Sequence, residues 1–181
     1  MQNEILLRVL ERYQKDIYCF CLQLTKNKSE AEDLFQDAFL KAIQLSHRLD
    51  TDDTKDKEAS RRNRNFVMGI AANLWKNRYR VAQRRRMLVS QCSYEEQETE
   101  PRAMVDLEEE IIKKEAIRHM RRVAAQLDEK YQIVISMYYT AQMSIEEMAE
   151  VLHIPKGTVK SRLHHARKKL KKGMEAKGYE I

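Results

Sequence analysis

The sequence has few of the residues that interrupt helices or form disulfide frameworks. Its 181 residues include only four glycines, two prolines and three cysteines. The long stretches without glycine or proline favour a mostly helical protein. No apolar run approaches the ~20 residues of a membrane span, and the N-terminal MQNEILLRVLERYQ lacks the pattern of a signal peptide. We therefore expect a cytoplasmic chain without stable membrane insertion.

Motifs of enzymes and metal sites are also missing. The chain has no glycine-rich phosphate loop, no HExxH and no GxSxG. Cys19, Cys21 and Cys92 form neither an even disulfide set nor a CxxC pair, and the five histidines have no ligand spacing with them. We expect core or partly exposed thiols, with a redox role less favoured. The sequence predicts a protein that is not an enzyme and needs no metal or cofactor.

Two segments of the sequence contain no acidic residue. The net charge of the whole chain is only +6, so the basic residues are unevenly distributed. Residues 61–86 hold nine basic residues and no acid, and residues 156–172 hold eight basic residues and no acid. Residues 94–110, in contrast, hold eight acids and the single Arg102. Two basic segments separated by an acidic one suggest two contacts with a polyanion, joined by a segment that avoids it.

The second basic segment belongs to a predicted helix-turn-helix over residues 144–172. Ser144 and Glu147 have the spacing of a capping box, and an apolar stripe of helical period follows. The sequence Ile154-Pro155-Lys156-Gly157 predicts a turn, after which Thr158 is the expected N-cap of a basic recognition helix. An ordinary helical hairpin with a solvated charged face is the alternative. Agreement of caps, turn, stripe and charge favours DNA binding.

The N-terminal half shows three helical patterns. Apolar residues at spacings of three or four predict a helix over residues 4–25, and a second helix should follow a cap at Ser29. Residues 48–65 have almost no large apolar side chain and are expected to form a mobile loop. A third helix should run from Phe66 through Arg86, with Phe66, Ile70, Leu74 and Val81 facing inward. Residues 78–86 are expected to form a basic ridge that includes Tyr79.

The C-terminal half shows helical patterns up to the helix-turn-helix. A linker over residues 89–105 is followed by apolar periodicity from Asp106, and Asp128 is a candidate cap for the next helix. Tyr131, Val134, Ile135, Tyr138 and Tyr139 should form its apolar face. The expected fold class is all-α, with two small helical domains joined by a flexible acidic linker.

Three motifs in one order resemble those of bacterial RNA polymerase sigma factors of the extracytoplasmic-function (ECF) family. AEDLFQDAFLKAIQ at residues 31–44 is similar to the family's core-binding helix. FVMGIAANLWKNRYR at residues 66–80 is similar to its promoter-melting segment. PKGTVKSRLHHAR at residues 155–167 nearly repeats its recognition-helix sequence, although His165 stands where the family often has arginine.

The resemblance implies a division of the chain and a role for each part. Residues 1–88 would be sigma domain 2, residues 89–106 the linker and residues 107–181 sigma domain 4. The chain would be an alternative sigma factor that binds core RNA polymerase and directs initiation at −35 and −10 promoter elements. An anti-sigma factor is a further implied partner.

The resemblance also implies site residues. Asp33, Gln36 and Asp37 would dock on the clamp coiled-coil of the polymerase largest subunit. The residues implied to bind and open the single-stranded −10 element are Arg61, Arg62, Arg64, Asn73, Trp75, Lys76, Arg78 and Tyr79. Trp75 has a plain core position as an equal alternative. The residues implied to bind the duplex −35 element are Thr158, Lys160, Ser161, Arg162, His164, His165, Arg167 and Lys168.

Two other classes of protein remain open from the residues. An autonomous helix-turn-helix regulator would bind duplex operators without polymerase. A nucleic-acid-modifying enzyme is disfavoured because the chain lacks a catalytic constellation.

Overall fold

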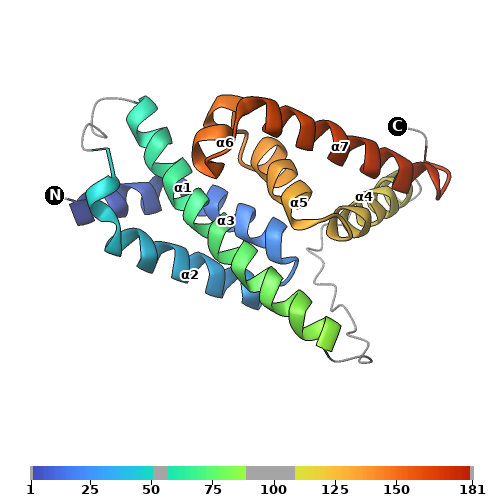
Figure 1. Ribbon diagram of the computed structural model, residues 1–181, viewed down its shortest axis with the longest axis horizontal. Coiled ribbons are helices and arrows are strands. Elements are labelled where there is room, and N and C mark those ends of the chain that lie inside the picture. Colours follow the sequence, from blue (N-terminus) through green and yellow to red (C-terminus); the bar gives the residue numbers. More distant parts are fainter. Residues whose placement is uncertain (1, 51–56, 89–108, 180–181) are drawn as a thin grey trace.

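The computed structural model describes residues 2–50, 57–88 and 109–179, where all regular elements are helical (Figure 1). The N-terminal half contains α1 (Gln2–Thr25), α2 (Lys28–Gln44), a 3-10 turn (Ser46–Arg48) and α3 (Lys57–Leu88). The C-terminal half contains α4 (Glu109–Ala125), α5 (Glu129–Ile135), a π-helical turn (Ser136–Thr140), α6 (Ile145–Leu152) and α7 (Lys156–Glu175). The predicted linker, residues 89–106, lies outside the described residues. No helix of the described ranges is long and apolar enough to cross a membrane.

The predicted apolar stripes of the first two helices form the N-terminal core. Ile17 and Phe20 of α1 and Leu34 of α2 are completely buried, and they pack with Met68 of α3. The side chain that caps α2 differs from the prediction. Asn27 is the N-cap, and its Oδ1 accepts from the backbone N–H of Glu30 at 3.1 Å, whereas Ser29 lies inside the helix.

The expected mobile loop is wrong for residues 57–65, because α3 begins at Lys57. The sequence misled because this part of the helix buries small and polar residues in place of large apolar ones. Ala59, Ser60, Asn63 and Asn65 are all at most 4% exposed. Their polar groups have partners: Asn63 Nδ2 donates to the Asp50 carbonyl at 3.0 Å, and Asn63 Oδ1 accepts from the Asp50 N–H at 2.8 Å. Burial of satisfied amides costs little, so a helix face can be polar and still buried.

Further along α3, the prediction is partly confirmed. Ile70 is buried and Phe66 and Leu74 are half-buried, whereas Val81 is 46% exposed. The helix has by then passed beyond the elements that cover its inner face (Figure 1). The last part of α3 therefore projects with basic residues on its surface.

The helix-turn-helix is confirmed, with a shift at its second helix. Ser144 and Glu147 form the predicted capping box, and α6 ends at His153 in the left-handed region. Helix α7 begins at Lys156 after an N-cap at Pro155, so Thr158 is within the first turn and does not cap the helix. Proline suits a helix start because its missing N–H would have no helical partner there.

Two details of α5 differ from expectation. Asp128 is its N-cap residue, but its side chain makes no capping hydrogen bond. Tyr138 and Tyr139 belong to the π-helical turn and are exposed, so they are not part of a buried face. The change of helical period at this turn rotates the two tyrosines away from the core.

The two halves pack together. A single buried cluster contains Val67, Met68 and Ala71 of the N-terminal half and Met148 and Ala149 of α6. Helix α6 contacts α3, and the π-helical turn contacts α1. Figure 1 shows α5 and α6 facing the long α3, with α7 on the outer side.

Candidate nucleic-acid interface

All the residues predicted to contact the −10 element come from α3, but the structure does not expose them equally. The exposed members are Arg61, Arg62, Asn73 and Arg78, and the half-buried members are Arg64, Lys76 and Tyr79. Trp75 is only 6% exposed and belongs to the core cluster, with its ring centroid 5.1 Å from that of Tyr79. The structure therefore favours the core alternative for Trp75.

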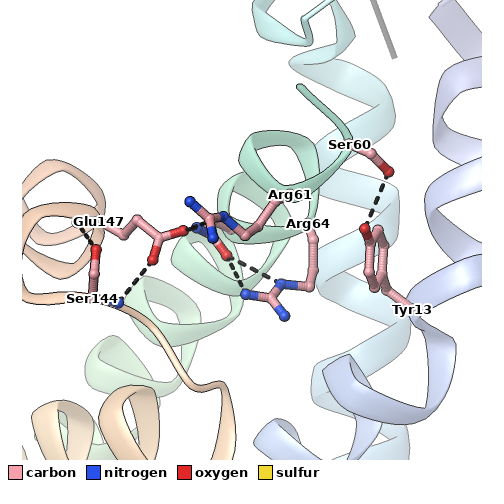
Figure 2. A network of polar contacts seen from close by, with 7 residues as sticks. Tyr13, Ser60, Arg61, Arg64, Ser144 and Glu147 are labelled. Carbon is pink, nitrogen blue, oxygen red and sulfur yellow. Dashed lines mark hydrogen bonds and ion pairs between the residues drawn. The ribbon is translucent and has the colours of Figure 1, made fainter. Parts of the chain in front are cut away.

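The first turns of α3 pack on Tyr13 of α1. Ser60 Oγ donates to the Tyr13 hydroxyl at 3.2 Å, and the Arg64 guanidinium lies 5.6 Å from the centre of the Tyr13 ring (Figure 2). Burial is the largest influence on Arg64 and lowers the pKa of its guanidinium. Stacking on the aromatic ring compensates part of the lost hydration of this cation.

Glu147 of α6 lies opposite the same turns of α3. Its Oε1 accepts from Asn65 Nδ2 at 2.6 Å and lies 2.9 Å from Arg61 Nε. Its Oε2 accepts from the Ser144 backbone N–H at 2.7 Å, completing the capping box. Figure 2 shows the Glu147 carboxylate between Ser144 and the basic start of α3. One carboxylate thus caps the first helix of the helix-turn-helix and joins the two halves of the chain.

Glu147 keeps its negative charge in this position. Burial by itself would raise the pKa of the carboxyl, but hydrogen bonds from Ser144 and Asn65 and the charge of Arg61 lower the pKa below its ordinary value. The capping and the inter-half contact both require an acceptor, so the ionised form suits both.

A second ion pair links α3 to the C-terminal half. Arg80 Nη2 lies 2.7 Å from Glu129 Oε1, and Arg80 Nε donates to the same oxygen at 2.9 Å. The Glu129 side chain is only 17% exposed, and its Oε2 is buried without a hydrogen-bond partner among the described residues. Arg80 therefore supplies the main compensation for a largely buried carboxylate.

The exposed face of α2 carries the residues predicted to bind polymerase. Asp33, Gln36 and Asp37 are all exposed, and the apolar Leu40 beside them is 59% exposed. Asp37 forms an ion pair with Arg78 of α3. An exposed acidic and apolar face is available for a protein partner, and one of its carboxylates is linked to the basic helix.

Helix α7 presents a continuous polar face. Its exposed members are Lys160, Ser161, His164, His165, Arg167 and Lys168, and its half-buried members are Thr158 and Arg162. Val159, Leu163 and Ala166 are buried on the opposite face. His165 Nδ1 is 2.7 Å from the Ser161 carbonyl oxygen, so Nδ1 carries the proton and donates to it. This contact holds the ring against the preceding turn of the helix.

The sequence analysis did not include Tyr138 and Tyr139, an aromatic pair beside α7, among the site residues. The Arg167 guanidinium lies 5.0 Å from the centre of the Tyr138 ring, and Arg167 Nε donates to the Tyr139 hydroxyl at 3.0 Å. Both tyrosines belong to the π-helical turn, Ser136–Thr140, where the sequence analysis predicted a continuous α-helical face. The sequence analysis also missed the polar contacts of Asp50, Asn63 and Glu129. Polar residues at single positions give no periodic signal from which their burial or pairing could be predicted.

The thiols of α1 agree with expectation. Cys19 is exposed and Cys21 is buried, and both are free. Burial raises the pKa of the Cys21 thiol to about 12, so this thiol stays protonated and unreactive at neutral pH. Cys92 lies outside the described residues.

Comparison with known proteins assigns both halves. Residues 9–85 match the family model for sigma-70 region 2, and residues 118–170 match that for sigma-70 region 4. The chain is 29% identical over 168 residues to the ECF RNA polymerase sigma factor SigW of Bacillus subtilis (strain 168), covering 91% of this chain and 86% of the relative. It is 23% identical over 167 residues to SigM of the same organism, covering 90% and 91%.

A solved structure supports the fold. The sigma factor RpoE of Bartonella quintana, determined in complex with the anti-sigma factor NepR, matches with a TM-score of 0.67 at 20% identity. The match covers 96% of each chain. The similarity therefore extends over both halves.

Proposed function

We propose the residues through which this chain, a member of the ECF family of bacterial RNA polymerase sigma factors and an alternative sigma factor in transcription initiation, performs its function. It binds core polymerase through α2, reads the −35 element with α7 and holds the opened −10 strand on α3. The observation that carries this proposal is the placement of two exposed basic faces on the two segments that match sigma-70 regions 2 and 4.

Asp33, Gln36 and Asp37 are the proposed contacts with the clamp coiled-coil of the polymerase largest subunit. Their exposure and their position on the face opposite the buried stripe of α2 support this role. Residues at spacings of three and four lie on one face of a helix, so the three side chains meet one partner surface.

The proposed −10 surface comprises Arg61, Arg62, Arg64, Asn73, Lys76, Arg78 and Tyr79 of α3. Cations neutralise the phosphates of the opened strand, and a flat aromatic or guanidinium surface stacks with unpaired bases. Trp75 supports this surface from the core by packing against Tyr79. The task requires no catalytic group, so we propose a non-catalytic protein.

The proposed −35 surface is the exposed face of α7. Lys160, Ser161 and His165 lie nearest the base edges of the major groove, whereas Arg162, Arg167 and Lys168 neutralise phosphates. Thr158 and His164 flank the same face. Histidine at position 165 lacks the bidentate fork with which arginine reads guanine, so its base preference should differ from that of relatives with arginine there.

We propose that the protein works in the cytoplasm and that an anti-sigma factor controls it. The RpoE structure, in which a sigma factor of this fold binds an anti-sigma factor, supports the second proposal. The alternative of an autonomous helix-turn-helix regulator does not explain an exposed acidic α2 face.

Transcription in vitro with core polymerase and fragmented genomic DNA, followed by mapping of the 5′ ends, tests the function. We expect new start sites that share −35 and −10 sequences. Failure of the wild-type chain to bind core polymerase in a pull-down would exclude the sigma mechanism.

The docking face is tested by Asp33→Arg combined with Gln36→Ala. We expect the pull-down to be lost, since the partner would meet reversed charge. Glu11→Arg, a charge reversal at an exposed position of α1, is the matched control and should leave binding intact. Equal binding by both variants would show that α2 is not the docking face.

A further inference from the structure

The π-helical turn before the helix-turn-helix holds two exposed tyrosines against the recognition helix. Tyr138 and Tyr139 of this turn are 36% and 57% exposed, and their rings meet edge to face with centroids 5.0 Å apart. The guanidinium group of Arg167 on α7 lies 5.0 Å from the centre of the Tyr138 ring and 5.6 Å from that of the Tyr139 ring. The three side chains form a tyrosine–arginine cluster, which includes one residue of the proposed −35 surface.

The cluster restrains the Arg167 side chain in two ways. Arg167 Nε donates a hydrogen bond to the Tyr139 hydroxyl oxygen at 3.0 Å. The cationic group is also attracted to the negative faces of the two rings. A free arginine side chain has many rotamers and loses this freedom when it binds a ligand. Because Arg167 is restrained before a ligand arrives, less conformational entropy remains to be lost on binding.

The restraint leaves Arg167 able to bind an anion. The bond to Tyr139 uses one of the five N–H donors of the guanidinium group, and the four donors on Nη1 and Nη2 are not part of it. These two nitrogens form a planar fork that matches two oxygens of a phosphate group. A tyrosine hydroxyl is neutral at pH 7, so it orients the cation without cancelling its charge. The carboxylates that pair with Arg78 and Arg80 of α3, in contrast, carry opposite charge.

The position of the cluster fits the backbone of duplex DNA. In a helix-turn-helix the second helix lies in the major groove, and the first helix crosses the phosphate backbone. The π-helical turn is separated from the first helix, α6, only by residues 141–144. Arg167 lies seven positions after Lys160, so the two exposed side chains share one face of α7. The fork of Arg167 therefore lies between the recognition face and the segment that approaches the backbone.

We propose that Tyr138 and Tyr139 are positioning residues of the −35 surface, which hold the Arg167 guanidinium so that its Nη1–Nη2 edge binds a phosphate of the −35 duplex. Phosphate contacts carry no base information, so the cluster strengthens binding without selecting a sequence. This inference rests on the proposed sigma function, and it adds two residues from outside the recognition helix.

A double-mutant cycle on Tyr139 and Arg167 tests the proposal. Tyr139→Phe removes the hydroxyl acceptor and keeps the ring, and Arg167→Ala removes the cation. Wild type, both single variants and the double variant are each assembled with core polymerase. Binding to a fluorescent duplex that carries a promoter mapped for the wild-type protein is then measured over a salt series. Tyr18→Phe, at a half-buried position of α1, is the matched control and should bind as the wild type does.

We expect Tyr139→Phe to weaken promoter binding about three- to tenfold, equally for matched and altered −35 sequences. The salt dependence should stay at the wild-type value because no cation is removed, whereas Arg167→Ala should reduce it by about one counterion. In the Arg167→Ala background, Tyr139→Phe should have no further effect. A tyrosine that only supported the fold would weaken binding equally in both backgrounds.

Two outcomes overturn the proposal. One is unchanged promoter binding by Tyr139→Phe, and the other is an equal loss from Tyr139→Phe with and without Arg167. Failure of the wild-type chain to form a holoenzyme that binds promoters would instead contradict the proposed function.

Tyr138→Leu tests the aromatic contact separately. Leucine keeps an apolar side chain at this position but has no π face for the guanidinium group. We expect promoter binding to weaken about two- to fivefold when Arg167 is present and to stay unchanged in the Arg167→Ala background. Wild-type affinity of Tyr138→Leu in the presence of Arg167 would show that Tyr138 does not position this arginine.

Discussion

The two basic helices, α3 and α7, differ in what surrounds their charges. On α3, Arg61 and Arg80 pair with carboxylates of the C-terminal half, and Arg78 pairs with Asp37 of α2. On α7, ion pairs involve Lys156, Lys169 and Lys171. Its central face is exposed, with Arg167 held by two tyrosines. The central face of α7 is thus exposed to solvent, whereas α3 is engaged by the rest of its own chain.

The difference shows that the number of basic residues in a segment does not by itself tell how much of their surface is available to nucleic acid. Each helix contains one of the two acid-free segments, residues 61–86 in α3 and residues 156–172 in α7. In three dimensions, acids from distant segments pair with basic residues of α3. The comparison predicts that substitutions on α3 alter both stability and DNA binding, whereas substitutions on the α7 face alter DNA binding alone.

The largest effect on stability is expected from Glu147→Arg. The change removes the capping-box carboxylate and places a cation beside Arg61, so we expect a loss of about 2 kcal/mol in the free energy of unfolding. Urea denaturation measures it. Glu150→Arg reverses an exposed charge on the same helix and should cost less than about 0.5 kcal/mol. An equal loss of unfolding free energy from the two changes would show that the contact of Glu147 with α3 does not stabilise the fold.

On α7, the expected effects concern DNA only. Lys160→Ala should change the preference among −35 sequences by about tenfold, because this side chain is proposed to meet base edges. Lys168→Ala should weaken binding to all sequences evenly and reduce the salt dependence by about one counterion. Binding of the promoter by the holoenzyme, measured over a salt series, separates the two. Identical behaviour of the variants would refute the assignment of one to bases and the other to phosphates.

A smaller effect should distinguish the two ion pairs in the second half of α3. Arg80→Ala leaves the largely buried Glu129 carboxylate without its cation, so we expect a loss of about 1–2 kcal/mol in the free energy of unfolding. Arg78→Ala breaks an exposed pair with Asp37 and should cost no more than about 0.5 kcal/mol. Thermal unfolding of both variants measures the difference, and the reverse order would contradict the contrast drawn between them.

A pH-dependent effect concerns a buried amine close to a cation of the other half. Lys26, in the turn between α1 and α2, is half-buried, and burial together with nearby Arg121 of α4 lowers the pKa of its amine to about 8. The folded pKa is below the unfolded value of 10.5. The unfolded chain therefore binds more protons between these values, and the Lys26 contribution to stability rises with pH there.

Lys26→Met should remove this pH-dependent contribution. The difference in unfolding free energy between variant and wild type should be largest at pH 7 and shrink towards pH 10, as measured by urea denaturation at each pH. Lys15→Met, at an exposed position of α1, should show no such trend. A difference for Lys26→Met that grows with pH would contradict the direction of the shift.

Much of the fold could be predicted because it depends on periodic patterns of large apolar residues. Ile17, Phe20 and Leu34 lie in the core as their spacing indicates, and Ser144 with Glu147 forms the predicted cap. The prediction failed where burial is polar or made of small residues. The first turns of α3 bury Asn63 and Asn65 against Asp50 and Glu147. A buried asparagine and an exposed asparagine look alike in a sequence.

The candidate site shows the same division. The exposed residues of α2 and α7 could be identified because each helix has a buried stripe, and the opposite face must then meet solvent or a partner. The position of Trp75 could not be settled, since a tryptophan in a basic helix is compatible with a core or a stacking role. Packing against the other helices decided it, and Trp75 is 6% exposed.

The sequence by itself determined the helical character, the helix-turn-helix and the two basic segments, because these depend on residues close together in the chain. The tertiary structure alone decided which of those basic side chains form ion pairs with distant acids. Arg61 and Asn65 lie 82 to 86 positions from Glu147 in the sequence, yet they share one carboxylate with it. Contacts at that separation depend on the packing of whole helices, and no local pattern encodes which distant acid meets which base.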